Sequence, residues 1–482
     1  MMRQALHIFC KDIRRLRYDI LVTLILAATF AWSTGQRTPV FDWQTDRLNR
    51  VAELLSLLLP LAWSYLVARA IYGEPLPGDC QFWVTKPYRW KSLLGAKVLF
   101  IVVFVILPLL LSDCAILALQ GFYPLDHLAG IAWHPLVFVA VFLLPVAALA
   151  CITVSIAQMV LAVLAVIAVL SVLLRLGITP STPWFGSPEW VRVSLAFLVL
   201  LLGGLTIMVL QYHARRTGIS RILASATLGL AMIVLGFLPL RVEFAMQSRL
   251  FKSRVDTSSI SIQLQPVRRL SPGPPQQSGN GVLVALPIDF SGVPLGMLAV
   301  VDGIAAELEL PDGKLSKPLL MQGNVTVTVD GKRRYPVSVE RNLYAQVKNT
   351  PLRMHLLVLL TLYGNPRTER MPIKGNFHRV PGVGVCAAEA LENRTRVGCS
   401  VPFRPPGRTK AQSENTIPVD SWAPYPLSPY PADFGISPMD HTEWSLPYQA
   451  GGRDIIFTTM QTLAHIRREI DIPNVQLADF AN

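Results

Sequence analysis

Apolar residues are unevenly spread along the chain: they form long runs in the first half and short alternating patches in the second. Each long run is close to the roughly 20 residues that a helix needs to cross about 30 Å of hydrocarbon. We place seven spans on these runs, at residues 19–35, 51–72, 94–120, 131–150, 155–176, 190–212 and 222–240. The pattern therefore predicts an α-helical polytopic membrane domain at 19–240.

Two boundaries of this domain need a physical argument. The nearly unbroken apolar stretch 133–176 is too long for one crossing, so we expect a tight turn near Ser155 and Gln158. Residues 1–18 are rich in charge and precede the first run, and no small-residue cleavage pattern follows that run. We expect residues 1–18 to form an amphipathic helix that leads into the first span, which remains as an anchor.

After residue 240 the pattern changes to alternating apolar and polar residues broken by Pro and Gly, which is typical of half-buried strands. The strongest hairpin signal joins 324–329 to 333–339 through Asp330-Gly331, a pair that tolerates the positive φ of a tight turn. We expect further strands at 259–263, 282–286, 306–310 and 354–362, and a closing helix where helical spacing returns at 455–470. These patterns predict a β-rich, sandwich-like domain at 241–482.

The composition supports a membrane protein, since 52% of the residues are hydrophobic and only 16% are charged. The net charge of +13 is explained by Lys and Arg beside the spans, where they remain cytoplasmic and meet anionic lipid. A nucleic-acid partner is not expected, because these basic residues do not interleave with aromatic residues in a soluble groove. The partner that the charge predicts is membrane lipid.

The richest short basic segments are the N-terminus, the loop 73–97 and the connection between the last two spans. With seven spans all three lie on one side, which the positive-inside rule assigns to the cytoplasm. The odd span number then places 241–482 outside the cytoplasm, at a plasma or inner membrane. Four basic residues follow the last span and favour the opposite placement: Arg241, Arg249, Lys252 and Arg254.

Two cysteines, Cys386 and Cys399, stand alone in the second half and flank a turn signal at 392–394. Facing each other across a hairpin in an oxidising compartment, they would form a disulfide worth on the order of 3 kcal/mol by the loop-entropy model. The alternative is two unpaired buried thiols. A disulfide would support the placement of this domain outside the cytoplasm.

The sequence contains few signs of chemistry. It has no GxxxxGK[ST] phosphate loop and no HExxH, GxSxG or CxxC motif, and its eight histidines are scattered. We therefore expect no catalytic residues, no cofactor and no metal site. Asp113 lies inside the third span and is a possible intramembrane polar site, because hydrocarbon makes a carboxylate charge costly. Alternatively, Asp113 lies near the outer end of that span and reaches interfacial water or stays protonated.

The loop 73–97 reads GEPLPGDCQFWVTKPYRWKSLLGAK. Its early prolines and glycine end the second span, and Asp79 can cap a short helix that contains Phe82 and Trp83 and ends at Pro87. The aromatic residues suit the headgroup layer, and the basic residues can reach water from it. The local pattern predicts a helix along the cytoplasmic surface, which a simple interfacial anchor would also explain.

The order of residues in this loop resembles the loop after the second span in permeases of the type-2 ABC exporter class. Residues 9–17 (FCKDIRRLR) are similar to the amphipathic N-terminal helix of that class, and the resemblance covers roughly residues 1–215. The matching loop residues are Glu74, Gly78, Phe82, Trp83, Pro87, Arg89 and Lys97. The predicted coupling loop also includes Lys86, and it has Asp79 where the family commonly has Thr. The resemblance implies a coupling helix that seats in a groove of a separate ATPase subunit.

The resemblance therefore implies a permease subunit that is not itself an enzyme and pairs with a second permease half, most simply its own copy, and with ABC-type ATPase subunits. Family members usually have six spans per half and end in the cytoplasm, so the seventh span and the outer domain are departures. The alternative is a non-transporting membrane-anchored protein that displays a β domain for sensing or envelope assembly. A membrane enzyme is less well supported, because no set of nucleophile, base and acid is present.

Overall fold

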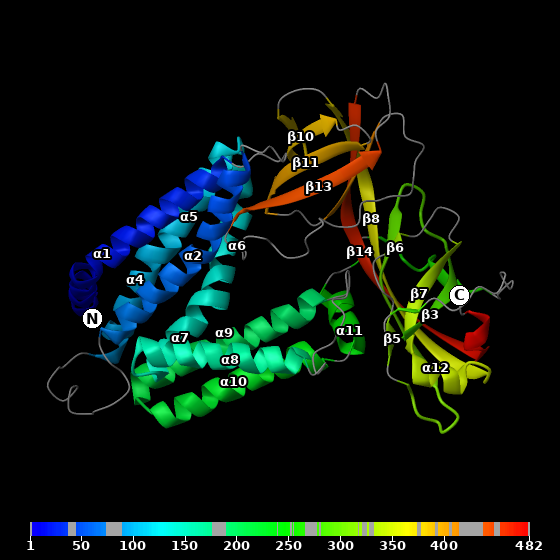
Figure 1. Ribbon diagram of the computed structural model, residues 1–482, viewed down its shortest axis with the longest axis horizontal. Helices are drawn as coiled ribbons and strands as arrows, with labels where there is room; N and C mark the ends of the chain where they lie inside the picture. Colours follow the sequence, from blue (N-terminus) through cyan, green and yellow to red (C-terminus); the bar gives the residue numbers. More distant parts are fainter. Residues whose placement is uncertain are drawn as a thin grey trace.

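The computed structural model of the chain describes residues 2–36, 45–73, 89–175, 189–238, 240–250, 253, 255–265, 277–278, 281–316, 318–320, 325–326, 332–373, 377–390, 394–403, 407–413, 437–447 and 454–480. Within these residues, helices gather on one side of the molecule and strands on the other (Figure 1). A set of apolar helices followed by a β-rich region of antiparallel sheets confirms the coarse architecture that the sequence predicts.

Six described segments are long and apolar enough to cross a membrane. They are α1 (Met2–Gly35), most of α2 (Thr45–Tyr72), α4 (Trp90–Ile101) with α5 (Leu107–Leu119), α6 (Leu128–Phe138) with α7 (Leu144–Ile152), α9 (Glu189–Ala214) and α10 (Thr217–Phe237). The fifth expected span falls on α8 (Ile156–Arg175), whose described apolar part is the shorter Ile156–Val169. The chain turns between α7 and α8, where the Gln158 backbone N–H donates to Ser155 Oγ at 3.3 Å.

Two of the long helices contain a π-helical turn: η1 (Val102–Ile106) joins α4 to α5, and η3 (Val139–Leu143) joins α6 to α7. Each turn ends two residues before a proline, Pro108 or Pro145. Proline lacks an N–H group and clashes with the preceding helical turn, so a wider turn at this position relieves the clash. The helix pairs α4–α5 and α6–α7 therefore continue across their prolines.

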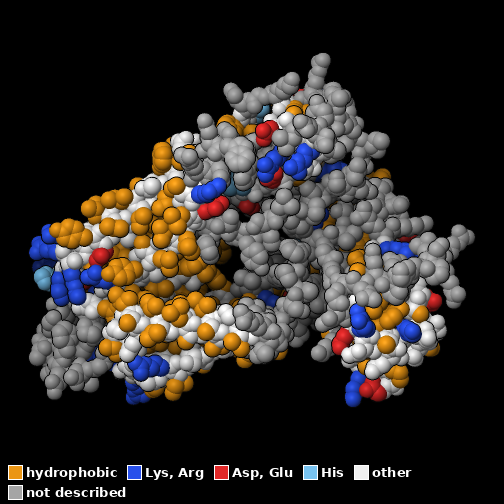
Figure 2. All heavy atoms as spheres, viewed as in Figure 1, with side chains coloured by type: hydrophobic (Ala, Val, Ile, Leu, Met, Phe, Trp, Pro, Cys, Tyr) orange, Lys and Arg blue, Asp and Glu red, His pale blue; other side chains and the backbone are white. Residues whose placement is uncertain are grey.

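One end of the helical bundle gathers the ends of several helices and many Lys and Arg side chains, seen at the left of Figure 2. Three contacts connect these helix ends: Arg15 with Gly73, Tyr72 with Thr153, and Trp90 with His213. We call this region the basic end. The opposite end holds the α5–α6 connection, including η2 (Pro124–His127), and lies against the strands; we call it the sheet end.

After α11 (Leu240–Leu250) the strands form three antiparallel sheets. The first sheet contains β1 (Ser261–Leu264), β2 (Gln277–Ser278), β3 (Gly281–Ser291) and β7 (Lys332–Glu340). The second contains β9 (His378–Val380), β10 (Gly384–Ala390), β11 (Arg394–Pro402) and β13 (Met439–Pro447). The third contains β4 (Leu298–Glu309), β5 (Leu319–Leu320), β6 (Val325–Thr326), β8 (Leu352–Pro372), β12 (Gly407–Ser413) and β14 (Asp454–Val475), and the short helices α12 (Arg341–Val347) and η4 (Leu477–Asp479) flank the strands.

The long strands β8 and β14 contribute to two separate hydrophobic cores. Leu356 of β8 and Ile466 of β14 belong to the core shared with the first sheet. Met371 of β8 and Ile455 of β14 belong to the core shared with the second sheet. The β-rich region thus contains two sandwich-like units, one formed by the first and third sheets and one by the second and third. Strands β8 and β14 belong to both units and run vertically in Figure 1.

The closing helix expected at 455–470 is wrong, because these residues lie within the 22-residue strand β14. This segment pairs with β8 over almost its whole length and is rich in β-branched residues, so tertiary pairing and strand propensity override the helical spacing. The hairpin between 324–329 and 333–339 is also wrong in its described residues. There, β6 pairs with β4 while β7 pairs with β3 in another sheet.

The cysteine prediction is confirmed. Cys386 in β10 and Cys399 in β11 are direct cross-strand partners, with Cα atoms 4.0 Å apart and a disulfide bond of 2.00 Å. Antiparallel pairing brings the two Cβ atoms within bonding reach, as the predicted hairpin requires. Because disulfides persist in oxidising compartments, this bond favours such a compartment for the second half of the chain.

Candidate functional site

A buried ion pair connects α1 to the start of α4 at the basic end. Lys97 Nζ lies 2.7 Å from Asp12 Oδ2, and the two side chains are only 2% and 3% exposed. Asp12 is spaced by four residues from the buried Ile8 and Leu16, so it lies on the face of α1 that packs inward. Removing Lys97 would leave the Asp12 carboxylate buried without this cation, so the pair holds α1 and α4 in one relative position.

A second set of contacts connects α1 to the end of α2. Arg15 Nη1 donates to the carbonyl oxygen of Gly73 at 3.0 Å, and Asp19 lies 3.5 Å from Arg69. Gly73 immediately precedes the loop segment 74–88, and Lys97 lies shortly after it. The first half of α1 is therefore bonded to both flanks of that segment.

The predicted coupling residues divide into two groups. Seven lie outside the described residues: Glu74, Gly78, Asp79, Phe82, Trp83, Lys86 and Pro87. Arg89 is exposed immediately before α4, and Lys97 is buried in the bundle. The partners Asp12 and Arg15 were not identified from the sequence, although a lone acid on an otherwise apolar helix face is a usable signal for such a pair.

Asp113, the predicted intramembrane polar residue, is fully buried between α5 and α6. Its Oδ2 lies 2.7 Å from Nδ1 of His134, whose side chain is 10% exposed, while its buried Oδ1 has no hydrogen-bond partner among the described residues. The side chain therefore faces a histidine on the neighbouring helix. This pairing could not be predicted from the sequence, because the two residues are 21 positions apart.

The second sheet contacts the sheet end of the bundle through Phe403. This residue follows β11 with a φ of 42°, which non-glycine residues rarely adopt. Its ring packs directly on Gly130, where a Cβ atom would lie 2.5 Å from the ring, and its centroid is 6.2 Å from that of His134. Arg379 adds a contact 5.4 Å over the Phe122 ring. Phe403 thus packs beside the Asp113–His134 pair from outside the bundle.

A buried polar chain forms a second link between strands and helices. Thr361 of β8 donates a hydrogen bond to Asp302 of β4, and its hydroxyl lies 2.7 Å from Nδ1 of His465 in β14. Gln247 of α11 lies 3.3 Å from the same His465 nitrogen. Burial raises the pKa of Asp302 to about 7, partly opposed by the Thr361 hydrogen bond and the Arg408 charge, and burial lowers the pKa of His465.

This polar chain can respond to protonation of Asp302. Thr361 has one hydroxyl proton, so it can donate either to Asp302 or to His465. When Asp302 is ionised, Thr361 donates to it and can accept from His465 Nδ1–H, in which case this nitrogen no longer accepts from Gln247 Nε2. When Asp302 is protonated, its own O–H can donate to Thr361, which then donates to His465. The charge of Asp302 therefore sets the direction of hydrogen bonding next to α11.

Comparison with known proteins gives no family for this chain: no family model matches it, and no curated protein is similar to it.

Proposed function

We propose that this chain is the permease subunit of an ATP-driven, ABC-type transporter, and that residues 73–97 dock on a separate ATPase. The observation that supports this most is the buried Asp12–Lys97 pair, through which the last residue of this segment is anchored to α1. A displacement of the loop would act on α1, α2 and α4 together, since Arg15 also holds Gly73. Helices that are bonded to one another in this way move together as one rigid body when the loop is displaced. Helices without such contacts would move independently of the loop.

We also propose seven spans with the β-rich region outside the cytoplasm. In support, α8 begins at the basic end, where the Tyr72 hydroxyl donates to Ser155 O at 3.1 Å. By contrast, α9 begins near α11, where Arg192 forms an ion pair with Glu243. These two contacts support a crossing by α8 from one end to the other, since a 20-residue helix covers about 30 Å. The disulfide favours the same placement.

The proposed complex contains two permease halves, most simply two copies of this chain, and two ATPase subunits in a plasma or inner membrane. No cofactor beyond the partner's ATP is needed. The cargo would pass between the spans, and the outer domain would receive, gate or hand on that cargo. The Phe403 contact and the polar chain would couple the outer domain to the helices.

Co-purification of the full chain from native membranes tests this proposal. We expect an ABC-type ATPase to accompany the tagged protein, and expect Arg89→Glu, which reverses a charge at the end of the loop, to weaken that association. Arg14→Glu, on the exposed face of α1, is the matched control. If no ATPase accompanies the protein and deletion of residues 74–88 leaves every complex unchanged, the proposal fails, and a membrane-anchored display protein becomes the better interpretation.

A further inference from the structure

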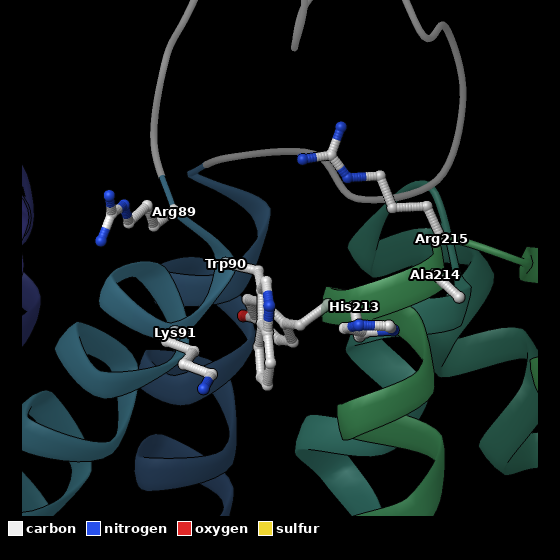
Figure 3. A pocket seen from close by; sticks show the side chains of 7 residues that line it. Arg89, Trp90, Lys91, His213, Ala214 and Arg215 are labelled. Carbon is white, nitrogen blue, oxygen red and sulfur yellow. The ribbon is translucent and has the colours of Figure 1, made fainter.

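A cleft of about 600 Å³ separates the start of α4 from the end of α9 at the basic end (Figure 3). Its lining residues are Arg89, Trp90 and Lys91 on one side and Tyr212, His213, Ala214 and Arg215 on the other. The Trp90 and His213 rings face each other edge to face, with centroids 5.2 Å apart. Figure 3 shows the Arg215 side chain extending from α9 back towards the α4 side. Three cationic side chains thus surround one recess.

Two cations of this cleft, Arg89 and Lys91, are available to an anion within the described part of the chain. Arg89 is exposed and Lys91 lies 5.5 Å over the Trp90 ring, and neither forms an ion pair there. The two acids of the first half of α1 are engaged elsewhere, by Lys97 and Arg69. A concave surface lined by one sign of charge concentrates counter-ions, so the cleft favours an anion.

Exposed apolar rows continue from both walls of the cleft along the proposed spans. Val98 and Val102 follow Lys91 by seven and eleven residues, and therefore lie on the same face of their helix; they are 49% and 42% exposed. The corresponding row below His213 on α9 consists of Val209, Leu205 and Leu202, which are 46%, 47% and 55% exposed. The cleft is cationic at its mouth and apolar beneath it.

We propose that this cleft binds the phosphate headgroup of an anionic phospholipid. Arg89, Lys91 and Arg215 surround the phosphate, Trp90 lies at the level of the headgroups, and the acyl chains follow the exposed rows of α4 and α9. Basic recesses between spans are suited to anionic headgroups, and indole rings favour the interface. A free phosphate or an acidic side chain of a partner would use the cations but leave the apolar rows without a role. The site requires no ATPase, so it extends beyond the proposed function.

The test measures lipid retained by the purified full chain. The protein is placed in nanodiscs of phosphatidylcholine with increasing phosphatidylglycerol, and bound lipid is counted by native mass spectrometry. Lys91→Gln with Arg215→Gln should lower the affinity for phosphatidylglycerol about 25-fold, because each nearby cation contributes about fivefold. The matched control, Arg14→Gln with Arg17→Gln, removes the same charge from the exposed face of α1 and should change the affinity much less.

Several outcomes would overturn the proposal. Equal losses in the two double variants would mean general attraction to an anionic surface. If glycerol phosphate competes as well as the intact lipid, the ligand is a soluble anion. If the cleft variant loses an associated ATPase while lipid retention is unchanged, the cleft is a protein contact.

A folding control keeps the result interpretable. The charge-conserving pair Lys91→Arg with Arg215→Lys should retain the lipid like the original chain. Should the double variant aggregate, Lys91→Gln alone is expected to lose about fivefold in affinity. An unchanged affinity in that single variant would contradict the proposal. Because these readouts need no ATPase, failure here is distinct from failure of the transporter proposal.

Discussion

The two ends of the helical bundle are held together in different ways. At the basic end, polar contacts such as Asp12–Lys97 join helices of the bundle to one another. At the sheet end, Phe403 and Met439 of the second sheet pack on the core of the bundle, and the chain through Asp302 joins α11 to the third sheet. Contacts between layers that have their own cores can open without unfolding either layer, whereas a buried ion pair within one core cannot. The comparison suggests a rigid basic end and a separable sheet end.

The largest expected effect comes from breaking the ion pair of the rigid end. Lys97→Met should destabilise the bundle by roughly 3–5 kcal/mol, because Asp12 is left buried without its cation. The double variant Asp12→Leu with Lys97→Met should recover most of that loss. Denaturant unfolding of the detergent-solubilised protein, followed by tryptophan fluorescence, measures both. Similar stability of the single and double variants would show that the pair does not fix α1 against α4.

The second prediction concerns pH at the sheet end. The pKa of Asp302 is raised to about 7 in the folded protein. Between the ordinary pKa of an Asp side chain, about 4, and pH 7, the folded state therefore keeps a proton that the unfolded state has released. Below about pH 4 both states are protonated; as pH rises towards about 7, stability falls by up to roughly 4 kcal/mol. Asp302→Asn, which can still donate to Thr361, should remove this fall and be the more stable form at pH 8. Unfolding curves recorded between pH 4 and 8 measure how the free energy of unfolding depends on pH. The same dependence in the variant and in the original chain would contradict the prediction.

The disulfide should matter to the sheet end alone. Cys386→Ser with Cys399→Ser should lower the stability of the second sheet by roughly 3 kcal/mol, since it frees a loop that the bond had closed. No described contact joins residues 386–399 to the Asp12–Lys97 pair, so the contribution of that pair to stability should not change. Limited proteolysis should show earlier cleavage within β9–β13 and no change in α1–α5. Equal cleavage of both regions would mean that the two ends unfold together.

Features set by local sequence were predicted better than contacts between residues that are far apart in the chain. Apolar runs of span length need no tertiary context, and Cys386 and Cys399 are neighbours across one local hairpin, so both features were predicted. By contrast, β14 has helical spacing in isolation and becomes a strand only through pairing with β8. The same limit applies at the candidate sites. Asp12 and Lys97 are 85 residues apart, and Asp302 and Thr361 are 59 apart, so only the fold brings them together.

The smallest expected effect concerns the Phe403 contact. Phe403→Ala removes a ring that packs on Gly130 but leaves both layers with their own cores, so global stability should fall by only about 1–2 kcal/mol, less than for a Phe in a closed core. Relative movement should change more: cysteines placed at the exposed Tyr123 of the bundle and at the exposed Phe377 just before β9 should be joined more slowly by a bifunctional thiol reagent. Gly130→Ala, which places a Cβ against the ring, should act in the same direction. Crosslinking that stays unchanged in both variants would mean that Phe403 does not hold the strands on the bundle, and that the sheet end is as rigid as the basic end.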